Sequence, residues 1–421
     1  MHPREEALAA LAKACEVSGG SDADAVDGIV PDYVARPDSV ESAAEVMRAA
    51  AERGLRVVPR GAGTKLDWGS PPAGVDLVVD TGRLDRVLEH AAGDLVVRVQ
   101  SGLTLGRLQV ALAAHGQELA LDEPVLGSTV GGMLATGTSG PRRLLHGGPR
   151  DLLIGITVVR ADGMIARSGG KVVKNVAGYD LGKLFTGSYG TLGLIVEAIF
   201  RLHPLPAASQ VVTWTAPDEG AAHERLQALL HSQLVPAAVE IDRPAPDAPI
   251  AIGVLLEGVA EGVTTRAEAA ARLLGNGFGG ADGAEVGTKP PAWWGRHPTD
   301  PDGVLVKLAA EVSALPHLLA AVARAARSAG LTPAVRGSAG GLLHVGLPVG
   351  TEPAAAAEFL AVLRPAVARH DGSAVVLHAP RAVRDAVDVW GPVPALGLMG
   401  RLKDQFDPQH RLAPGRFVGG I

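Results

Sequence analysis

Two short glycine-rich turns constrain this sequence more than any other feature. The first, residues 59–64, reads Pro-Arg-Gly-Ala-Gly-Thr and follows a short strand predicted at Leu55–Pro59; the second, residues 128–132, reads Ser-Thr-Val-Gly-Gly. Glycines let several backbone N–H groups converge on one anion, because no side chain blocks the approach. The hydroxyls of Thr64 and Thr129 can add donors. Together the turns predict a diphosphate cradle, although either turn alone is equally compatible with an ordinary strand connection.

The common nucleotide motifs are absent from both turns. Gly61 and Gly63 lack the third glycine of the dinucleotide fingerprint, because Leu66 stands in its place. A phosphate-binding P-loop is excluded at Gly182-Lys183, which Leu184 follows. Any cradle made by these turns must therefore belong to another architecture.

The elements around the first turn predict a small α/β unit. Residues 39–53 have the periodicity of an amphipathic helix, with Ser39 as its cap and Gly54 at its end. The strand before the turn and a second strand at Leu77–Asp80 complete the unit. A second block follows, with buried strands at Leu95–Gln100 and Leu152–Arg160 and a helix at Leu103–His115. The glycine-rich stretch Gly127–Gly148 is expected to be a long functional loop.

The pattern changes after residue 206. Helices predicted at Thr265–Leu274 and His317–Ala329 alternate with strands at Ile250–Leu255 and Gly341–Leu347. This alternation indicates a separate α+β domain. A last helix is predicted at Ala395–Phe406.

Composition excludes several classes of protein. The chain has 421 residues, 47% of them hydrophobic, and a net charge of −6, so it is expected to be globular, with no nucleic acid as partner. Its single cysteine, Cys15, excludes a disulfide scaffold and a cysteine zinc site, and is expected to be a buried thiol on an N-terminal helix. The N-terminus lacks the apolar core of a signal peptide, and the longest apolar run, Leu152–Val159, is too short to span a bilayer. The expected location is cytoplasmic.

Longer stretches carry a family resemblance. Arg36-Pro37-Asp38-Ser39 before a helix, followed by both glycine turns, resembles the PCMH-type FAD-binding domain of the vanillyl-alcohol oxidase family. The segments Gly169–Asp180 and Leu184–Gly193 resemble the glycolate oxidase and D-lactate dehydrogenase branch of that family. The ending at residues 406–416 fits as well, although Ala413 stands where the family usually has Asn.

The resemblance implies an α+β fold in three parts. A two-part PCMH-type FAD-binding domain would occupy residues 1–206, with subdomains at about 1–90 and 91–206. An α+β cap or substrate domain would follow at 207–394. A C-terminal helix and tail, 395–421, would return to the FAD domain.

The resemblance also assigns residues to FAD. The first turn would bind the diphosphate through backbone N–H groups, and residues from the second turn onward would line the other side, the isoalloxazine ring and the adenosine end. The implied set is Pro59, Arg60, Gly61, Ala62, Gly63, Thr64, Pro124, Ser128, Thr129, Gly131, Gly132, Ala135, Gly137, Gly140, Gly193 and Ile195. Many members attach the flavin covalently through a His or Cys in the first turn. This turn continues Lys65-Leu66-Asp67, so the FAD is expected to be non-covalent.

Oxidation of a 2-hydroxy acid needs a base for the hydroxyl proton and a cation for the carboxylate. The catalytic candidates are His344, His378 and Arg336, with Arg381, Arg142, Arg143 and His146 as further basic residues. His344 lies where catalytic members of the family carry a metal-binding pair of histidines, but no second histidine is near it. No metal site is expected.

The missing second histidine favours the FAD-binding E subunit of glycolate oxidase over its D subunit. The same E subunit is resembled by the sequences Val389-Trp-Gly-Pro392 and Leu402–Pro408. Such a subunit would oxidise a small 2-hydroxy acid together with a second flavin subunit and an iron–sulfur subunit, and could associate with a membrane through them. Two alternatives stay open: a free-standing FAD-linked oxidoreductase for another hydroxy acid or alcohol, and a flavin-binding subunit without catalytic activity.

Overall fold

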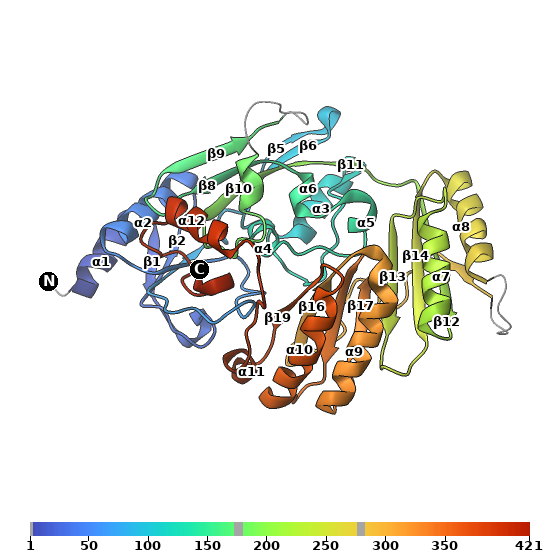
Figure 1. The fold of residues 1–421 in the computed structure, drawn as a ribbon. Helices are drawn as coiled ribbons and strands as arrows, with labels where there is room; N and C mark the ends of the chain where they lie inside the picture. The colour runs from blue at the N-terminus through green and yellow to red at the C-terminus, as the bar shows by residue number, and fades with distance from the viewer. Residues whose placement is uncertain (1–2, 172–179, 276–282) are drawn as a thin grey trace. The chain divides into compact units, whose positions relative to one another are not determined.

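The chain divides into two compact units, each combining helices with sheets (Figure 1). The computed structural model describes residues 3–171, 180–275 and 283–421. The first unit comprises Met1–Ser139, Gly148–Leu205 and Val393–Ile421; the second comprises Gly140–Gly147 and Pro206–Pro392. The predicted α+β class is confirmed.

The first unit begins with a small mixed sheet whose strand order is β1-β2-β4-β3. Strands β2, β3 and β4 are parallel, and β1 pairs antiparallel with β2. The elements are α1 (Pro3–Leu11), β1 (Glu16–Gly19), β2 (Tyr33–Arg36), α2 (Val40–Glu52), β3 (Val57–Arg60) and β4 (Leu77–Asp80). Helix α2 follows the predicted cap, since Ser39 Oγ accepts a hydrogen bond from Ser42 N at 3.2 Å. Its apolar face, including Met47, is buried, and the first glycine turn follows β3 directly.

A five-stranded antiparallel sheet, ordered β5-β6-β10-β8-β9, forms the second part of this unit. Its strands are β5 (Val87–Ala91), β6 (Val96–Gln100), β8 (Leu153–Val159), β9 (Ile165–Gly169) and β10 (Leu194–Arg201), with a two-stranded ribbon of β7 (Gln117–Glu118) and β11 (His203–Pro204). Helices α3 (Leu105–Ala113), α4 (Val130–Thr136) and α6 (Pro149–Leu152) share one apolar core with it, in which Leu108, Leu134 and Phe200 are fully buried.

The expectation of one long loop over residues 127–148 is wrong. Helix α4 begins inside it, because Thr129 Oγ1 accepts a hydrogen bond from Gly132 N at 3.2 Å and caps the first turn. Val130, Met133 and Leu134 bury one face of this helix. Two glycines in its first turn lower the helix propensity and hide this periodicity in the sequence.

The position expected for Cys15 is also wrong. Helix α1 ends at Leu11, and Cys15 lies directly before β1, partly exposed rather than buried. Its Sγ donates to the carbonyl of Glu16 at 3.4 Å, and partial burial raises the pKa of the thiol.

The second unit is built on one eight-stranded antiparallel sheet, ordered β15-β12-β14-β13-β17-β18-β16-β19. Its strands are β12 (Ala208–Ala216), β13 (Ala238–Arg243), β14 (Ile250–Gly258), β15 (Glu285–Gly287), β16 (Val304–Ala309), β17 (Ala334–Ser338), β18 (Leu342–Leu347) and β19 (Ser373–His378). Its helices are α5 (Arg143–His146), α7 (Glu219–Leu230), α8 (Ala260–Gly275), α9 (Leu315–Ala329), α10 (Pro353–Ala368) and α11 (Arg381–Ala386).

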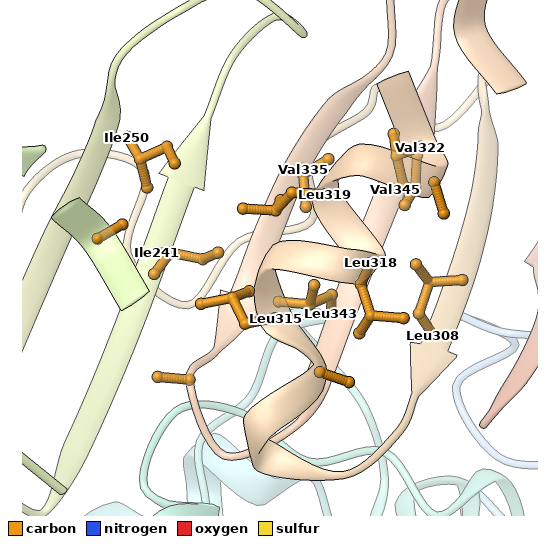
Figure 2. Packing of buried hydrophobic residues seen from close by; sticks show 14 of the residues in the cluster. Ile241, Ile250, Leu308, Leu315, Leu318, Leu319, Val322, Val335, Leu343 and Val345 are labelled. Carbon is orange, nitrogen blue, oxygen red and sulfur yellow. The ribbon is translucent and has the colours of Figure 1, made fainter. Parts of the chain in front are cut away.

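One face of this sheet forms the apolar core of the unit. Figure 2 shows helix α9 laid along the sheet, with Leu318 and Val322 directed at Leu343 and Val345 of β18. All four side chains are at most 2% exposed. Since side chains alternate between the faces of a strand, the residues between the core positions lie on the opposite face.

The C-terminal stretch, Val393–Ile421, belongs to the first unit. After α12 (Leu396–Phe406), Lys403 Nζ donates to Asp407 Oδ2 at 2.7 Å and to the carbonyls of Thr191 and Leu412, both at 2.9 Å. Lys403 and Asp407 are 0% exposed. Leu412 forms a β-bridge with Val57 of β3, so the chain end is fixed to the strand that leads into the first glycine turn.

Candidate functional site

An open pocket lies in the first unit where the two glycine turns meet; its volume is about 530 Å³ when the open solvent at its mouth is included. Its walls come from the turn after β3, the start of α4, the turn before β10 and the C-terminal stretch. The lining residues are Pro59, Gly61, Ala62, Gly63, Thr64, Lys65, Leu66, Thr129, Gly132, Ala135, Thr136, Tyr189, Gly190 and Arg416.

The two turns touch at Gly61. A Cβ atom at this position would lie 2.2 Å from Thr129 Oγ1, a distance that only glycine avoids. Thr129 is fixed in turn by its hydrogen bond to Gly132 N. Gly61 therefore allows the contact that closes the cradle on this side.

Gly131 and Gly132 serve different purposes. Gly131 N donates to the carbonyl of Ser101 at 2.7 Å, and a Cβ here would lie 2.9 Å from Ser101 Cβ. Gly131 thus packs against the chain, whereas Gly132 lines the pocket. Gly132 is the glycine of this pair that leaves room for a ligand.

Lys65 is a buried cation in the pocket wall. Its side chain is 8% exposed, and its Nζ donates to Ser128 Oγ at 2.6 Å and to Thr64 Oγ1 at 3.2 Å. Burial lowers the pKa of Lys65 to about 8, against a smaller opposing effect of the Glu123 charge. The amine therefore links the two turns without an anion in hydrogen-bond contact.

Two residues distant in sequence complete the wall. Arg416 Nη2 donates to the carbonyls of Leu66 at 2.6 Å and Trp68 at 2.7 Å, which holds the chain after the first turn. Tyr189 adopts a φ of +55°, and its N–H donates to the carbonyl of Ala135 at 2.8 Å. Burial raises the pKa of Tyr189 far above its usual range, so the phenol is neutral.

The predicted flavin residues fall into two groups. Pro59, Gly61, Ala62, Gly63, Thr64, Thr129, Gly132 and Ala135 line the pocket. Arg60 instead pairs with Asp24 at 3.0 Å and Asp80 at 2.8 Å, and Ser128 holds Lys65.

The others lie further away in the fold. Pro124 is partly exposed just before the second turn, Gly137 ends α4, Gly193 packs against the Phe185 ring, and Ile195 pairs with Val158 inside the five-stranded sheet. Gly140 belongs to the second unit.

Sequence reasoning did not assign Lys65, Leu66, Thr136, Tyr189, Gly190 or Arg416 to the pocket. Tyr189 and Gly190 lie in the segment Leu184–Gly193, and Arg416 ends the segment 406–416, so the motifs that carry the family resemblance contained this signal. For Lys65, the sequence indicates only that it is not a covalent anchor for the flavin. The stretch Val172–Tyr179 of the remaining motif lies outside the described residues.

In the second unit, the sheet face opposite the apolar core carries a row of polar side chains, three of them of ionic residue types. Asp242 pairs in register with Arg336, Arg336 with His344, and His344 with Lys307, across β13, β17, β18 and β16. Residues opposite each other in register point to the same face. The four side chains therefore form one continuous polar row.

The two cations of this row differ in their partners. Arg336 Nη2 lies 2.7 Å from Asp242 Oδ1, and its Nη1 donates to the carbonyl of His297 at 3.1 Å. Lys307 has no hydrogen-bond or salt-bridge partner in the part of the chain that is described. Burial, and next the charge of Arg143, lower its pKa. Arg336 is thus neutralised within the protein, and Lys307 is not.

His344 is a neutral imidazole. Burial, followed by the positive charges of His297, Lys307 and Arg143, holds its pKa well below the usual range, so it can accept a proton at neutral pH. The rings of His344 and His297 are 4.9 Å apart. His378, at the end of β19, contacts the carbonyl of Pro301 with Nε2.

Within residues 3–171, 180–275 and 283–421, no group of three or more His, Cys, Asp or Glu side chains could hold a metal ion. In the same ranges, none of the helices is both long and apolar enough to cross a membrane.

Comparison with known proteins supports FAD as a cofactor of this chain. Residues 31–169 match a family model described as FAD binding domain. This range contains both glycine turns and Lys65. The glycines that line the pocket leave the backbone of the turns open to a ligand, as binding of a diphosphate requires.

Curated relatives match over part of their length. Glycolate oxidase subunit GlcD of Bacillus subtilis is 34% identical over 217 residues, 51% of this chain and 46% of that protein. Glycolate oxidase subunit GlcE of Escherichia coli is 38% identical over 155 residues, 36% of this chain and 44% of that protein. The chain thus spans less than half the length of each of these relatives.

A solved structure matches almost the whole chain. p-Cresol methylhydroxylase with substrate bound has a TM-score of 0.77 and 16% identity, covering 98% of this chain and 96% of that one. At this identity the likeness shows the fold. The fold and the matched domain agree with the resemblance that the motifs carry: residues 31–169 form an FAD-binding domain, and the chain has the fold of this flavoprotein structure.

Proposed function

We propose that this chain oxidises a small 2-hydroxy acid to the 2-oxo acid as the FAD-binding subunit of a glycolate-oxidase-type complex. In this proposal the FAD is held non-covalently, and the electrons pass to a second flavin subunit and an iron–sulfur subunit. Bound FAD would supply the two-electron acceptor for the reaction. The names of the two curated relatives, both subunits of glycolate oxidases, support the substrate class and the assembly.

The observation that carries the proposal is the charged row of the second unit. A 2-hydroxy acid presents a carboxylate and a neighbouring hydroxyl group. Lys307 offers a cation without an internal counterion, and His344 on the adjacent strand offers a neutral ring nitrogen. In this assignment Lys307 binds the carboxylate and His344 takes the hydroxyl proton.

This assignment revises the roles expected from the sequence. Arg336 was expected to bind substrate, but Asp242 and the carbonyl of His297 already engage its guanidinium. We therefore assign Arg336 a positioning role, since it lies between Asp242 and His344 in the row and holds the chain at His297. His378 is not used in this proposal.

The test is the visible absorption spectrum of the purified chain before and after anaerobic glycolate or D-lactate, alone and with its co-purifying partners. We expect a flavin that acid releases from the protein. We expect a 2-hydroxy acid to bleach its absorption band, either in the purified chain or in the complex with its partners. Flavin that no 2-hydroxy acid reduces even there would contradict the proposal and favour a non-catalytic flavin subunit. Reduction by an alcohol without a carboxylate would favour the free-standing oxidoreductase.

Two variants and a matched control test the residue roles. Lys307→Met is expected to raise KM for the acid about 10- to 100-fold, as expected for loss of a charged contact. His344→Gln is expected to lower kcat about 100-fold or more with normal flavin content. Lys289→Met, at an exposed lysine of the same unit, should change neither value. A Lys307→Met enzyme with unchanged KM would remove this residue from the site.

A further inference from the structure

Lys65 is a buried cation of the pocket whose direct hydrogen-bond partners are uncharged. The side chain is more than nine-tenths buried, and its two hydrogen-bond partners are the neutral hydroxyls of Thr64 and Ser128. An amine taken out of water is costly unless an anion accompanies it. Within the described residues no carboxylate forms an ion pair with Lys65.

The surroundings of Ser128 explain why its hydroxyl accepts from Lys65. Ser128 Oγ donates its own proton to the carbonyl of Val125 at 2.5 Å, which leaves its lone pairs for the amine. Ser128 N donates to Glu123 Oε1 at 2.8 Å, so the Glu123 carboxylate is bound by the backbone and acts on Lys65 only through its charge. The amine thus spans from the first turn to the second and keeps a third N–H for another acceptor.

We propose that Lys65 is the cation that neutralises the diphosphate of FAD and, by joining the two glycine turns, positions their backbone N–H groups around it. The geometry that carries this inference is a buried amine in the lining of the pocket, between two turns that touch at Gly61 and Thr129. The inference rests on FAD binding and not on the oxidation proposed above.

The proposal predicts that FAD affinity depends on pH. The pKa of Lys65 is lowered to about 8 without ligand, and a bound diphosphate would raise it. Binding therefore favours the protonated amine: affinity is full below pH 8 and falls as the pH rises further. The other charged or titratable groups near the amine are Glu123, Arg416 and Tyr189, and burial raises the pKa of Tyr189 far above this range, so its phenol stays neutral.

The experiment compares FAD with riboflavin, which has no phosphate. The full-length chain is freed of flavin and titrated with each ligand from pH 6.5 to 9.5, with quenching of flavin fluorescence as the readout. For Lys65→Met we expect the Kd for FAD at pH 7 to rise about 10- to 100-fold, with no rise above pH 8, and the Kd for riboflavin to stay unchanged. Lys65→Arg should keep FAD affinity at pH 7 and lose the dependence above pH 8.

A matched control is Lys13→Met, which removes an exposed lysine of the same unit and should leave both Kd values unchanged. If Lys65→Met weakens riboflavin as much as FAD, Lys65 is only structural and the proposal is wrong. An FAD Kd within threefold of wild type, with the same pH profile, would also overturn it. Should Lys65→Met fail to fold, Lys65→Arg and Ser128→Ala carry the test, since Ser128→Ala removes the link and should weaken FAD but not riboflavin.

Discussion

Two buried lysines of the first unit, Lys65 in the pocket wall and Lys403 under the C-terminal stretch, occupy opposite electrostatic situations. Lys403 has a carboxylate, Asp407, and two carbonyl groups within 2.9 Å. Lys65 has only two hydroxyl groups. Burial lowers the pKa of both, but for Lys403 the hydrogen bond and the charge of Asp407 oppose the effect directly.

The difference indicates that Lys403 stabilises the fold, whereas Lys65 fits the role proposed for it in ligand binding. A buried cation with all its donors used stabilises one arrangement of the chain, and its removal leaves a buried carboxylate without a counterion. A buried cation without an anion lowers the stability of the flavin-free protein, and an anionic ligand would supply its counterion on binding. The same residue type therefore serves stability in one place and affinity in the other.

The largest effect is expected at Lys403. Lys403→Met leaves Asp407 buried without a counterion, with only the hydrogen bond from Leu412 N, and should lower the free energy of unfolding by about 3–5 kcal/mol, measured by urea denaturation. Adding Asp407→Leu should restore a large part of this loss, because the unpaired charge is then gone. A loss below about 1 kcal/mol would break the comparison, since Lys403 would then not be the structural member of the pair.

A smaller effect of opposite sign is expected at Lys65. In the flavin-free chain at pH 7, Lys65→Met removes a buried charge without a counterion and should raise the free energy of unfolding by about 1–2 kcal/mol. The measurement is again urea denaturation, with Lys13→Met as control. A loss comparable to that of Lys403→Met would show that the hydroxyl contacts are sufficient partners for the amine.

The smallest effect is a change with pH. Between pH 8 and pH 10 the unfolded chain keeps a proton on residue 65 that the folded, flavin-free chain has lost, so the contribution of Lys65 to stability rises with pH. The advantage of Lys65→Met should therefore shrink by about 1 kcal/mol per pH unit above pH 8. A constant difference from pH 7 to 9.5 would indicate that Lys65 does not titrate there.

The elements of the fold follow largely from local sequence. The cap at Ser39 and the apolar face of α2 predict this helix to within a residue at each end, and the motif order led to the PCMH-type fold. Helix α4 was missed because Gly131 and Gly132 lower its propensity, and the structure shows that Thr129 compensates with a cap.

The candidate sites follow from sequence only where the backbone makes them. The glycine turns indicate a diphosphate cradle because glycine has no side chain to keep a ligand away from the backbone N–H groups. The role of Lys65 in the pocket depends on the direction of its side chain, and the role of Arg416 depends on a contact with a residue 350 positions away. The periodicity of the sequence reveals neither. The row from Asp242 to Lys307 required the register of four strands, because no local pattern places Lys307 beside His344.

The contact of Arg416 with Leu66 also has a consequence for the time at which the flavin can be captured. These residues are 350 positions apart, and the whole second unit is translated between them. At about 5–20 residues per second, a ribosome needs roughly 20 to 70 s to cover that interval. During this time the first turn has left the ribosome, but the arginine that holds the chain behind it does not yet exist. Flavin insertion is therefore expected to follow translation, because the wall of the pocket is complete only after Arg416 has been synthesised.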